Sequence, residues 1–357
     1  MRIYIVVPSL IDTAPIKGAI ALANGLVNYY EIFFVALMHV DNNVGILLNS
    51  DIKTISFAHV SKPWRKFLEY RKLVLNDKTN TVYISSCLSA DIANWLVRKH
   101  VTIISSVRGN LLKNYFFRFG LIGYLLAKFH LRLLRNFDQV VAISKTMAKQ
   151  LHKNRIKRII IVGNFLDETR LRVSSNRASS ISGSKIHFLF LARLVKIKRP
   201  ELLIKAAYEI KKKNINFQIS IVGDGFLRNK LERYTTYLGL QKEIIFYGHV
   251  FEPYNIIKNA DYMILPSVSE GISRSILEAL YLGIPCIATN TNESRELIKE
   301  GQNGFLFDNI TELVEKMVMA YELFKPLSLY QRENLLPPFF SQEINIRKYM
   351  KVLDGYK

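Results

Sequence analysis

The chain has 357 residues, 49% of them hydrophobic, and a formal net charge of +21 from 50 Lys and Arg against 29 Asp and Glu. This length fits two domains of ordinary size, and the apolar content is enough to bury substantial cores. No apolar run approaches the roughly 20 residues that a membrane-spanning helix needs, and the opening MRIYIVVPSL, interrupted by Pro8, is too short for a secretory signal. Cys87 and Cys286 lie far apart without metal-ligand spacing, so we expect free thiols in a reducing, cytosolic compartment.

The first half of the chain alternates short apolar runs with helical stretches. The runs predicted as buried strands are Ile3–Val7, Phe33–Leu37, Thr81–Ser85, Val101–Ser105 and Gln139–Ile143. Helices are expected between some of them, near Ala19–Tyr29 and Ala90–Lys99. This alternation is typical of α/β proteins and predicts a doubly wound parallel sheet.

Positive charge concentrates in residues 108–158, which carry twelve basic side chains and a single acid, Asp138. Such asymmetry favours a polyanionic partner: nucleic acid, anionic lipid or a phosphorylated substrate. The sequence has neither zinc-finger spacing nor an RNP-like aromatic run, so we expect no nucleic-acid partner.

Residues 113–136 mix basic, aromatic and aliphatic side chains. Wound as one helix, they place on one side Phe119, Ile122, Leu126, Phe129 and Leu133. The basic residues on or near the other side are Lys113, Arg118, Lys128, Arg132 and Arg135. A helix lying on an anionic membrane and a helix packed on the core share this periodicity, and Gly120 and Gly123 weaken one continuous helix. The local charge excess favours contact between these basic residues and a membrane.

The polar stretch Ser174–Ser184 precedes a second set of strands and is the predicted linker. The strands expected after it are Ile186–Leu191, Ile219–Val222, Ile244–Tyr247, Tyr262–Leu265 and Cys286–Ala288. We predict a first domain at 1–170, a linker at 171–184, a second domain at 185–335 and a C-terminal helix within 336–357. This pseudo-repeat indicates two Rossmann-like domains that bind ligands at the carboxyl ends of their strands.

The segment Pro266–Thr289, PSVSEGISRSILEALYLGIPCIAT, is the most informative part of the chain. It leaves a strand through a polar loop, and from about Ser273 its apolar spacing becomes helical. Glu270 and Glu278 therefore flank a loop-to-helix junction, with seven residues between them. The N–H groups of a helix start bind anions such as phosphates, and carboxylates suit sugar hydroxyls. An isolated pair of glutamates is more often one capping and one solvated side chain.

The whole segment resembles the E-x7-E signature of retaining glycosyltransferases of group 1 (GT4), which have the α/β GT-B fold. The matching residues are Glu270, Gly271, Glu278, Ala279, Gly283, Pro285, Ile287, Ala288 and Thr289. Cys286 is the one departure from the pattern. The resemblance implies two Rossmann-like domains that face each other across a cleft, with the last helix, Ser341–Leu353, crossing back to the first domain.

A second element, Ala192–Lys198, follows the first strand of the second half and resembles the family's G-R-L-x-x-x-K-G. Arg193 and Lys198 stand where the family holds the donor diphosphate. Two cations beside a helix start can neutralise a leaving diphosphate without a metal. Ala192 and Arg199 replace the two glycines of the family pattern, which alters the backbone next to the phosphates.

Further donor contacts follow from the resemblance. Glu278 binds the donor ribose and Glu270 contacts the sugar near its hydroxyls, which makes Glu270, Arg193 and Lys198 the candidate catalytic residues. The other residues expected at the donor are Gly271, Ser273, Arg274, Gly18, Gly223 and Gly248. Gly18 lies in the loop after the first strand. For Gly223 and Gly248 a purely conformational role is the alternative, and for Ser273 an N-cap.

The first domain matches the family less well. Arg108 stands where many relatives place a histidine, and as a permanent cation it can hold a phosphate or sugar hydroxyl but cannot act as a base. Asn164 belongs to an element that resembles the family's I-P-N-x-x-D, with Gly163 in place of the proline. Both residues are candidates for the acceptor side of the cleft, although turn-capping is the favoured role for Asn164.

The resemblance implies transfer of a sugar from a UDP- or GDP-sugar, with retention of configuration, to a lipid-linked polyprenyl diphosphate glycan. The pathway expected is O-antigen, lipopolysaccharide or capsule biosynthesis, at the inner face of the cytoplasmic membrane. The nucleotide-sugar is a substrate, so no cofactor and no metal are expected. Two alternatives remain: a GT-B epimerase or hydrolase that acts on the donor alone, and a non-enzymatic basic protein that binds polyanions.

Overall fold

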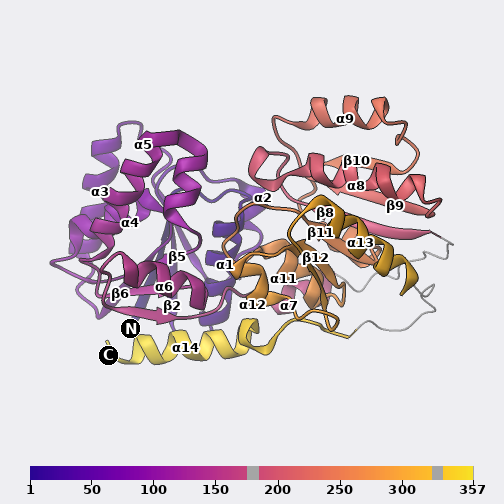
Figure 1. The fold of residues 1–357 in the computed structure, drawn as a ribbon. Helices are drawn as coiled ribbons and strands as arrows, with labels where there is room; N and C mark the ends of the chain where they lie inside the picture. The colour runs from indigo at the N-terminus through magenta and orange to yellow at the C-terminus, as the bar shows by residue number, and fades with distance from the viewer. Residues whose placement is uncertain (175–184, 324–332, 357) are drawn as a thin grey trace. The chain divides into compact units, whose positions relative to one another are not determined.

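The computed structural model describes residues 1–174, 185–323 and 333–356 (Figure 1). The chain forms two compact units: unit 1 comprises Met1–Asp167 and Pro338–Lys357, and unit 2 comprises Glu168–Pro337. Each unit is built around one parallel sheet, of seven strands in unit 1 and six in unit 2. Residues 171–174 of the predicted linker continue helix α7 (Glu168–Ser174), and residues 175–184 lie outside the described residues.

The sheet of unit 1 has the strand order β3-β2-β1-β4-β5-β6-β7. Its strands are β1 (Arg2–Val7), β2 (Glu31–Ala36), β3 (Lys53–Ser56), β4 (Thr81–Ser85), β5 (Thr102–Val107), β6 (Gln139–Ala142) and β7 (Ile159–Ile161). This is the doubly wound order of a Rossmann sheet, as the alternation of strands and helices predicts. Every residue of β4 is buried, because a parallel sheet is covered on both faces.

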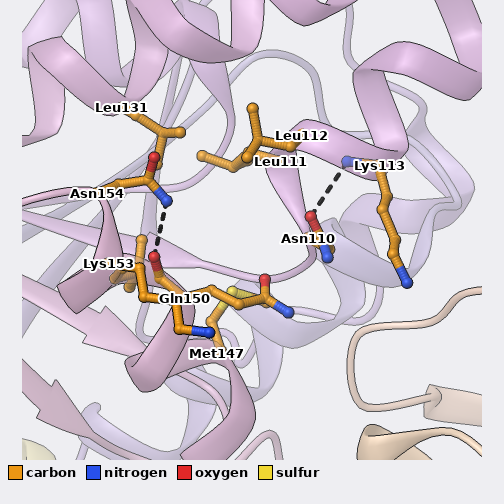
Figure 2. A pocket seen from close by; sticks show the side chains of 10 residues that line it. Asn110, Leu111, Leu112, Lys113, Leu131, Met147, Gln150, Lys153 and Asn154 are labelled. Carbon is orange, nitrogen blue, oxygen red and sulfur yellow. Dashed lines mark hydrogen bonds between the residues drawn. The ribbon is translucent and has the colours of Figure 1, made fainter.

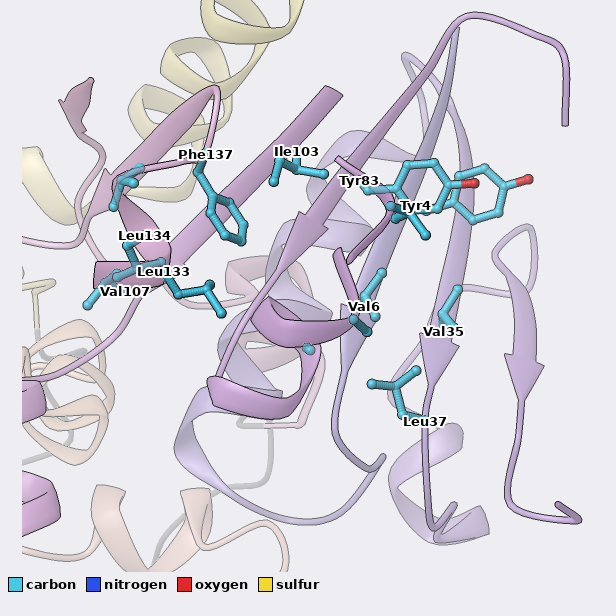
Figure 3. Close-up of a cluster of buried hydrophobic side chains, with 14 of the residues drawn as sticks. Tyr4, Val6, Val35, Leu37, Tyr83, Ile103, Val107, Leu133, Leu134 and Phe137 are labelled. Atoms are coloured by element: carbon cyan, nitrogen blue, oxygen red, sulfur yellow. The ribbon is translucent and has the colours of Figure 1, made fainter. Parts of the chain in front are cut away.

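The core of unit 1 joins this sheet to the helices on one of its faces (Figure 3). Tyr4 and Tyr83, on neighbouring strands, stack their rings 4.5 Å apart between centroids. Leu134 and Phe137, at and just beyond the end of helix α5 (Leu111–Leu134), belong to the same cluster of buried side chains. The carboxyl-terminal end of α5 is therefore fixed to the core by apolar packing.

Some helices of unit 1 start at residues that suit helix N-termini. They are α1 (Ala14–Leu26), α2 (Asn42–Gly45), α3 (Pro63–Asn76), α4 (Leu88–Val97), α5 (Leu111–Leu134), α6 (Lys145–Lys153) and α14 (Gln342–Asp354), with a 3₁₀ turn η2 (Pro338–Phe340). Asn110 caps α5 and Ser144 caps α6, each accepting a hydrogen bond from a backbone N–H. Pro15 lies in the first turn of α1, so this helix begins earlier than expected and Gly18 lies inside it, not in a loop.

Helix α14 belongs to unit 1 although it follows unit 2 in the chain. Asn345 on α14 accepts a hydrogen bond from the Gly163 N–H at 2.7 Å, and the Tyr349 hydroxyl lies 3.4 Å from Ser106 Oγ. A side chain at Gly25 on α1 would collide with Ile346, which shows how closely the two helices pack. The structure thus confirms that the last helix of this α/β fold packs on the first domain.

Helix α5 is bent, which the sequence analysis did not foresee. Gly120 has φ 59° and ψ −138°, values outside the helical region, and divides the helix into two arms. The Tyr115 hydroxyl and His130 Nδ1 share a hydrogen bond of 3.1 Å. Because fifteen residues of straight helix span about 22 Å, this contact requires the first arm to fold back along the second. Residues 111–134 therefore form a helical hairpin.

The sheet of unit 2 has the order β10-β9-β8-β11-β12-β13. Its strands are β8 (Ile186–Leu191), β9 (Phe217–Val222), β10 (Ile244–Gly248), β11 (Tyr262–Leu265), β12 (Cys286–Thr289) and β13 (Gly304–Phe307). Besides α7, its helices are η1 (Lys196–Lys198), α8 (Pro200–Lys212), α9 (Arg228–Tyr237), α10 (Tyr254–Lys258), α11 (Arg274–Tyr281), α12 (Asn292–Leu297) and α13 (Ile310–Glu322). Unit 2 repeats the doubly wound order of unit 1, with β8 and β11 as its central neighbours.

Candidate functional site

The candidate donor site lies where the strand order of unit 2 reverses. The chain leaves β8 to form β9 on one side, whereas β11 pairs with β8 on the other side. Arg193 and Lys198 follow the carboxyl end of β8, and Glu270 follows that of β11. In doubly wound sheets, ligands bind at this switch point because the flanking loops diverge there. The fold therefore brings together the two motifs that the sequence analysis singled out.

The Lys198 ammonium forms an ion pair with the Glu270 carboxylate, and both side chains are largely buried, with 18% and 13% exposed. The backbone joins the same two loops, because the Val268 N–H donates to the Ile197 carbonyl at 2.9 Å. Lys198 ends the 3₁₀ turn η1, and Arg199 in the left-handed conformation leads into α8. Without a ligand, each charge is thus neutralised by the other.

A second ion pair lies further along the E-x7-E segment, between two residues of α11 that are one helical turn apart. Arg274 Nε donates to Glu278 Oε1 at 3.0 Å, and both side chains are less than 10% exposed. Ser273 occupies the N-cap position of α11, but its hydroxyl contacts Ser275 Oγ and makes no capping bond. Burial, and secondarily the charge of nearby Glu278, raises the pKa of the Tyr254 hydroxyl. Tyr254 therefore stays a neutral hydroxyl at physiological pH.

Glycines let the strand-end loops of β8, β9 and β10 approach one another. A Cβ at Gly223, which has φ +133°, would lie 2.0 Å from the Ala192 carbonyl oxygen. The Gly223 N–H donates to the Gly248 carbonyl at 2.7 Å, and Gly248 itself has φ +70°. The positive φ values of Gly223 and Gly248 thus show that both glycines have a conformational role. The same contacts also fix the loop that carries Arg193.

Arg193 and Gly271 are the remaining candidate residues of the two motifs. Arg193 is exposed, and its side chain forms no hydrogen bond or ion pair within the described ranges. Gly271 is partly exposed between Glu270 and the buried Ile272. Arg193 therefore offers a cation that a soluble anion can reach.

Three buried polar atoms near these strand ends have no hydrogen-bond partner in the described part of the chain. They are Ser267 Oγ, Arg274 Nη1 and Thr289 Oγ1. An unsatisfied buried polar atom costs about 1–3 kcal/mol, so each of these atoms is a candidate contact for a polar ligand. Ser267 is not among the predicted site residues; the signal for it is a polar residue two positions after the end of a buried strand.

The candidate residues of unit 1 form a separate cluster. Arg108 Nη1 donates to Asn164 Oδ1 at 3.0 Å, and a Cβ at Gly18 would lie 2.0 Å from that same Nη1. Gly18 therefore makes room for the Arg108 guanidinium, which lies beyond the end of β5. Cys87, beyond β4, has its pKa raised to about 11 by burial, so this thiol stays protonated.

The five basic residues predicted to contact a membrane are all exposed: Lys113, Arg118, Lys128, Arg132 and Arg135. Of the predicted apolar face, Phe119, Ile122, Leu126 and Phe129 are exposed, but Leu133 is buried. The carboxyl-terminal end of the helix thus packs on the core, whereas most of the large apolar residues between 116 and 129 are exposed.

An apolar pocket of about 280 Å³ lies in unit 1 between α5 and α6 (Figure 2). Leu111, Leu112 and Leu131 line it from α5, and Met147 and Leu151 line it from α6. Two lysines, Lys113 and Lys153, belong to the same lining. Apart from Lys113, the pocket contains none of the predicted site residues.

The described ranges contain no group of three His, Cys, Asp or Glu side chains arranged to hold a metal ion. Metal independence stays a prediction. Within these ranges, no helix combines the length and apolarity needed to cross a bilayer. Cys286 is buried and Cys87 partly buried, and both are free thiols.

Part of the chain is similar to a known protein family. Residues 172–323 match the family of glycosyl transferases group 1. A UDP-Gal:α-D-GlcNAc-diphosphoundecaprenol α-1,3-galactosyltransferase of Escherichia coli is 33% identical over 184 residues, which cover 49% of this chain and 46% of the relative. The chain spans 46%, 61% and 42% of the length of the first curated relatives that it matches.

Two further proteins match nearly the whole chain. A GalNAc-α-(1->4)-GalNAc-α-(1->3)-diNAcBac-PP-undecaprenol α-1,4-N-acetyl-D-galactosaminyltransferase of Campylobacter jejuni is 24% identical over 344 residues, covering 90% of this chain and 89% of the relative. The crystal structure of HepE from Anabaena with UDP-glucose superposes with a TM-score of 0.75 at 15% identity, covering 99% of this chain and all of that chain. The chain therefore has the GT-B fold, and its residues 172–323 are similar to the group 1 glycosyl transferases.

Proposed function

We propose that the protein is a retaining glycosyltransferase that moves a sugar from a UDP-sugar to a hydroxyl of a lipid-linked glycan. The observation that carries the proposal is the Lys198–Glu270 ion pair at the switch point of unit 2. A cation and a carboxylate at one strand edge suit the two ends of a sugar diphosphate. The first can bind the phosphates, and the second can bind the sugar hydroxyls.

The ion pair also suggests how the donor is received. A nucleoside diphosphate competes with Glu270 for the Lys198 ammonium, because its phosphates carry more negative charge than one carboxylate. Released from Lys198, the Glu270 carboxylate accepts hydrogen bonds from the sugar. Arg193, which is exposed, adds a second cation at the diphosphate. Glu278, held by Arg274 at 3.0 Å, is already oriented to accept from the ribose hydroxyls.

In the proposed reaction, the bond between the anomeric carbon and the diphosphate oxygen breaks, and a bond to the acceptor oxygen forms on the same face. The acceptor proton passes to the departing diphosphate. Arg193 and Lys198 stabilise the negative charge that develops on this leaving group, so no metal is invoked. The products are UDP and the extended glycan.

We favour a UDP-sugar over a GDP-sugar as the donor. The E. coli relative carries UDP-Gal in its name, and HepE was crystallised with UDP-glucose. These relatives support uracil as the base of the donor nucleotide. They do not determine which sugar the donor carries. GDP-sugars are the competing donors in the test below.

We propose a polyprenyl diphosphate glycan as the acceptor, with surface polysaccharide as the pathway and an anionic membrane surface as the location. Both curated relatives described above carry undecaprenol in their names. In this chain, the apolar pocket with Lys113 and Lys153 suits a lipid segment that ends in a diphosphate. Arg108, held by Asn164, is a further cation for the acceptor side.

The test is transfer from a panel of UDP- and GDP-sugars to a short-chain prenyl diphosphate N-acetylglucosamine, followed by mass spectrometry. We expect one UDP-sugar to give a product heavier by one sugar, and NMR of the product to show that the anomeric configuration of the donor is retained. An inverted linkage contradicts the retaining mechanism. Release of free sugar or of an epimerised donor, without transfer, supports the hydrolase or epimerase alternative.

A further inference from the structure

The α5 hairpin exposes an unusual concentration of apolar side chains. Of the twenty-five exposed large apolar residues among those described, nine lie between residues 116 and 129. The most exposed are Leu121 at 77%, Ile122 at 69% and Leu125 at 67%, directly after the bend at Gly120. Contiguous exposed apolar surface of this kind marks an interaction site, because leaving it in water costs free energy.

The bend turns this apolar surface into a tip. Tyr115 and Gly123 are in contact across the bend, since a Cβ at Gly123 would lie 1.9 Å from the Tyr115 carbonyl oxygen. The two arms therefore pack together and present the residues between them at one end of the hairpin. Phe117, Phe119 and Leu121, all about half exposed or more, belong to this end.

A buried polar network holds the hairpin to unit 1. His130 Nε2 lies 2.6 Å from Asp91 Oδ2, and the Ser85 hydroxyl donates to the other carboxylate oxygen at 2.6 Å. His130 also bonds Tyr115 on the first arm, so both arms connect through it to α4 and β4. The hairpin is therefore a fixed projection of unit 1, with an exposed tip and a base in the core.

The charges around the tip favour a lipid surface as the occupant. Residues 111–137 contain no Asp or Glu, whereas Arg118, Lys128 and Arg132 are exposed on the hairpin. The Arg118 guanidinium lies 5.0 Å from the centroid of the Phe119 ring, and Lys128 lies 5.4 Å from that of Tyr124. Aromatic rings beside long cationic side chains suit the boundary between acyl chains and phosphate headgroups.

We propose that the α5 hairpin is a membrane wedge: its apolar tip inserts among the acyl chains of a leaflet while Lys128 and Arg132 contact anionic headgroups. This deepens the proposed function, since it assigns the element that brings the enzyme to a lipid-borne acceptor. It differs from a helix lying flat on the surface, because the two arms enter together and the first residues to enter are aliphatic.

The test uses tryptophan as a depth probe in the full-length protein. Leu121→Trp is mixed with vesicles of phosphatidylcholine and phosphatidylglycerol, with or without bromine on the acyl chains, and the wild-type emission is subtracted. We expect a blue shift and strong quenching by the brominated lipid. Tyr237→Trp, at a position 83% exposed in unit 2, is the matched control and should show neither.

A second pair of variants measures binding. Leu121→Ser with Ile122→Ser and Leu125→Ser should weaken co-sedimentation with these vesicles about tenfold or more. Ile46→Ser with Leu68→Ser and Leu75→Ser removes exposed apolar residues elsewhere in unit 1 and should bind like the wild type. Unquenched emission from the Leu121→Trp variant, or equal binding by the two triple variants, overturns the wedge. If the first triple variant converts a dimer to a monomer, the tip contacts a second copy of this chain instead of a membrane.

Failure of the wedge and failure of the proposed function give different results. The vesicles contain neither nucleotide-sugar nor acceptor, so quenching reports insertion alone. Transfer to the short-chain acceptor in solution reports catalysis alone, and we expect the triple variant at the tip to keep it. A wedge without transferase activity, or transferase activity without a wedge, is therefore recognisable.

Discussion

The strand-end loops of unit 2 and the α5 hairpin of unit 1 are unusual in opposite ways. The first region buries charged side chains, and the second exposes apolar ones. The loops and the start of α11 bury charge: Lys198, Glu270, Arg274 and Glu278 are all less than 20% exposed. The hairpin exposes apolar side chains, up to 77% of Leu121. Both arrangements cost free energy in the isolated protein, and we propose that binding offsets each cost, through a polar ligand at the loops and an apolar phase at the hairpin.

The largest effect is expected where a buried charge is removed from the proposed donor site. Lys198→Met should lower the rate of sugar transfer by about 10²–10³-fold, because the leaving diphosphate loses a cation. Lys196→Met, two residues earlier and exposed, is the control and should transfer at the wild-type rate.

Removing Lys198 also leaves Glu270 without its partner, so folding must be measured separately. The double variant Lys198→Met with Glu270→Gln removes both charges, and we expect it to melt near the wild-type temperature and to stay inactive. If folded Lys198→Met transferred sugar at the wild-type rate, the ion pair would have no role in catalysis.

Helix α5 allows the exposed and buried faces of one element to be compared. Leu134→Ala, in the core, should lower the free energy of unfolding by about 3 kcal/mol. Ile122→Ala, 69% exposed, should change it by no more than about 0.5 kcal/mol. Denaturant unfolding of the two variants measures both values. A large loss from Ile122→Ala would mean that this residue packs within the protein in solution and is not free to insert.

Gly223 tests how tightly the loops of unit 2 are built. Gly223→Ala forces a side chain against the Ala192 carbonyl at an unfavourable φ of +133°, and should destabilise the protein by about 2 kcal/mol or more. Gly239→Ala also has a positive φ but open space around the new Cβ, so it should cost about 1 kcal/mol. Equal losses in thermal unfolding would show that backbone strain, and not loop packing, determines the effect.

Asp77 is a buried carboxylate in unit 1 that accepts hydrogen bonds from several side chains of the protein itself. Burial raises its pKa, but hydrogen bonds from Thr79, Tyr4 and Arg2 outweigh burial and lower the pKa to about 2. The unfolded carboxyl titrates near 4, so this stabilisation is present above about pH 4 and is lost as the pH falls toward 2. We expect the wild type to lose about 2 kcal/mol more than Asp77→Asn between pH 5 and pH 2 in denaturant unfolding.

Local sequence patterns predict most of the fold and the donor motifs. The central strands are recognisable because a buried parallel strand is apolar along its whole length, as Tyr262–Leu265 is. The edge strands β3, β7 and β13 are not among the predicted strands. No residue of β3 or β7 is buried, and Lys53–Ser56 is mostly polar. The Lys198–Glu270 contact could be expected only through the family resemblance, since 72 residues separate its partners.

The hairpin could not be predicted from spacing. Gly120 and Gly123 indicate a weak helix, but the fold-back depends on the contact of Tyr115 with His130 and on the attachment of His130 to Asp91. Gly18 is expected in the loop after the first strand, whereas Pro15 lies in the first turn of a helix that includes Gly18. Tertiary contacts and one proline therefore explain the main differences between the predicted and the observed structure.

The central claim is that the loops after β8 and β11 bind a nucleoside diphosphate. The most direct test is thermal unfolding with UDP, GDP, CDP and NAD, for the wild type and for Arg193→Ala/Lys198→Ala. A ligand that binds only the native state raises the melting temperature by mass action. We predict a rise with UDP alone, and its loss in the double variant. An equal rise in both proteins, or no rise with any nucleotide, would contradict the claim.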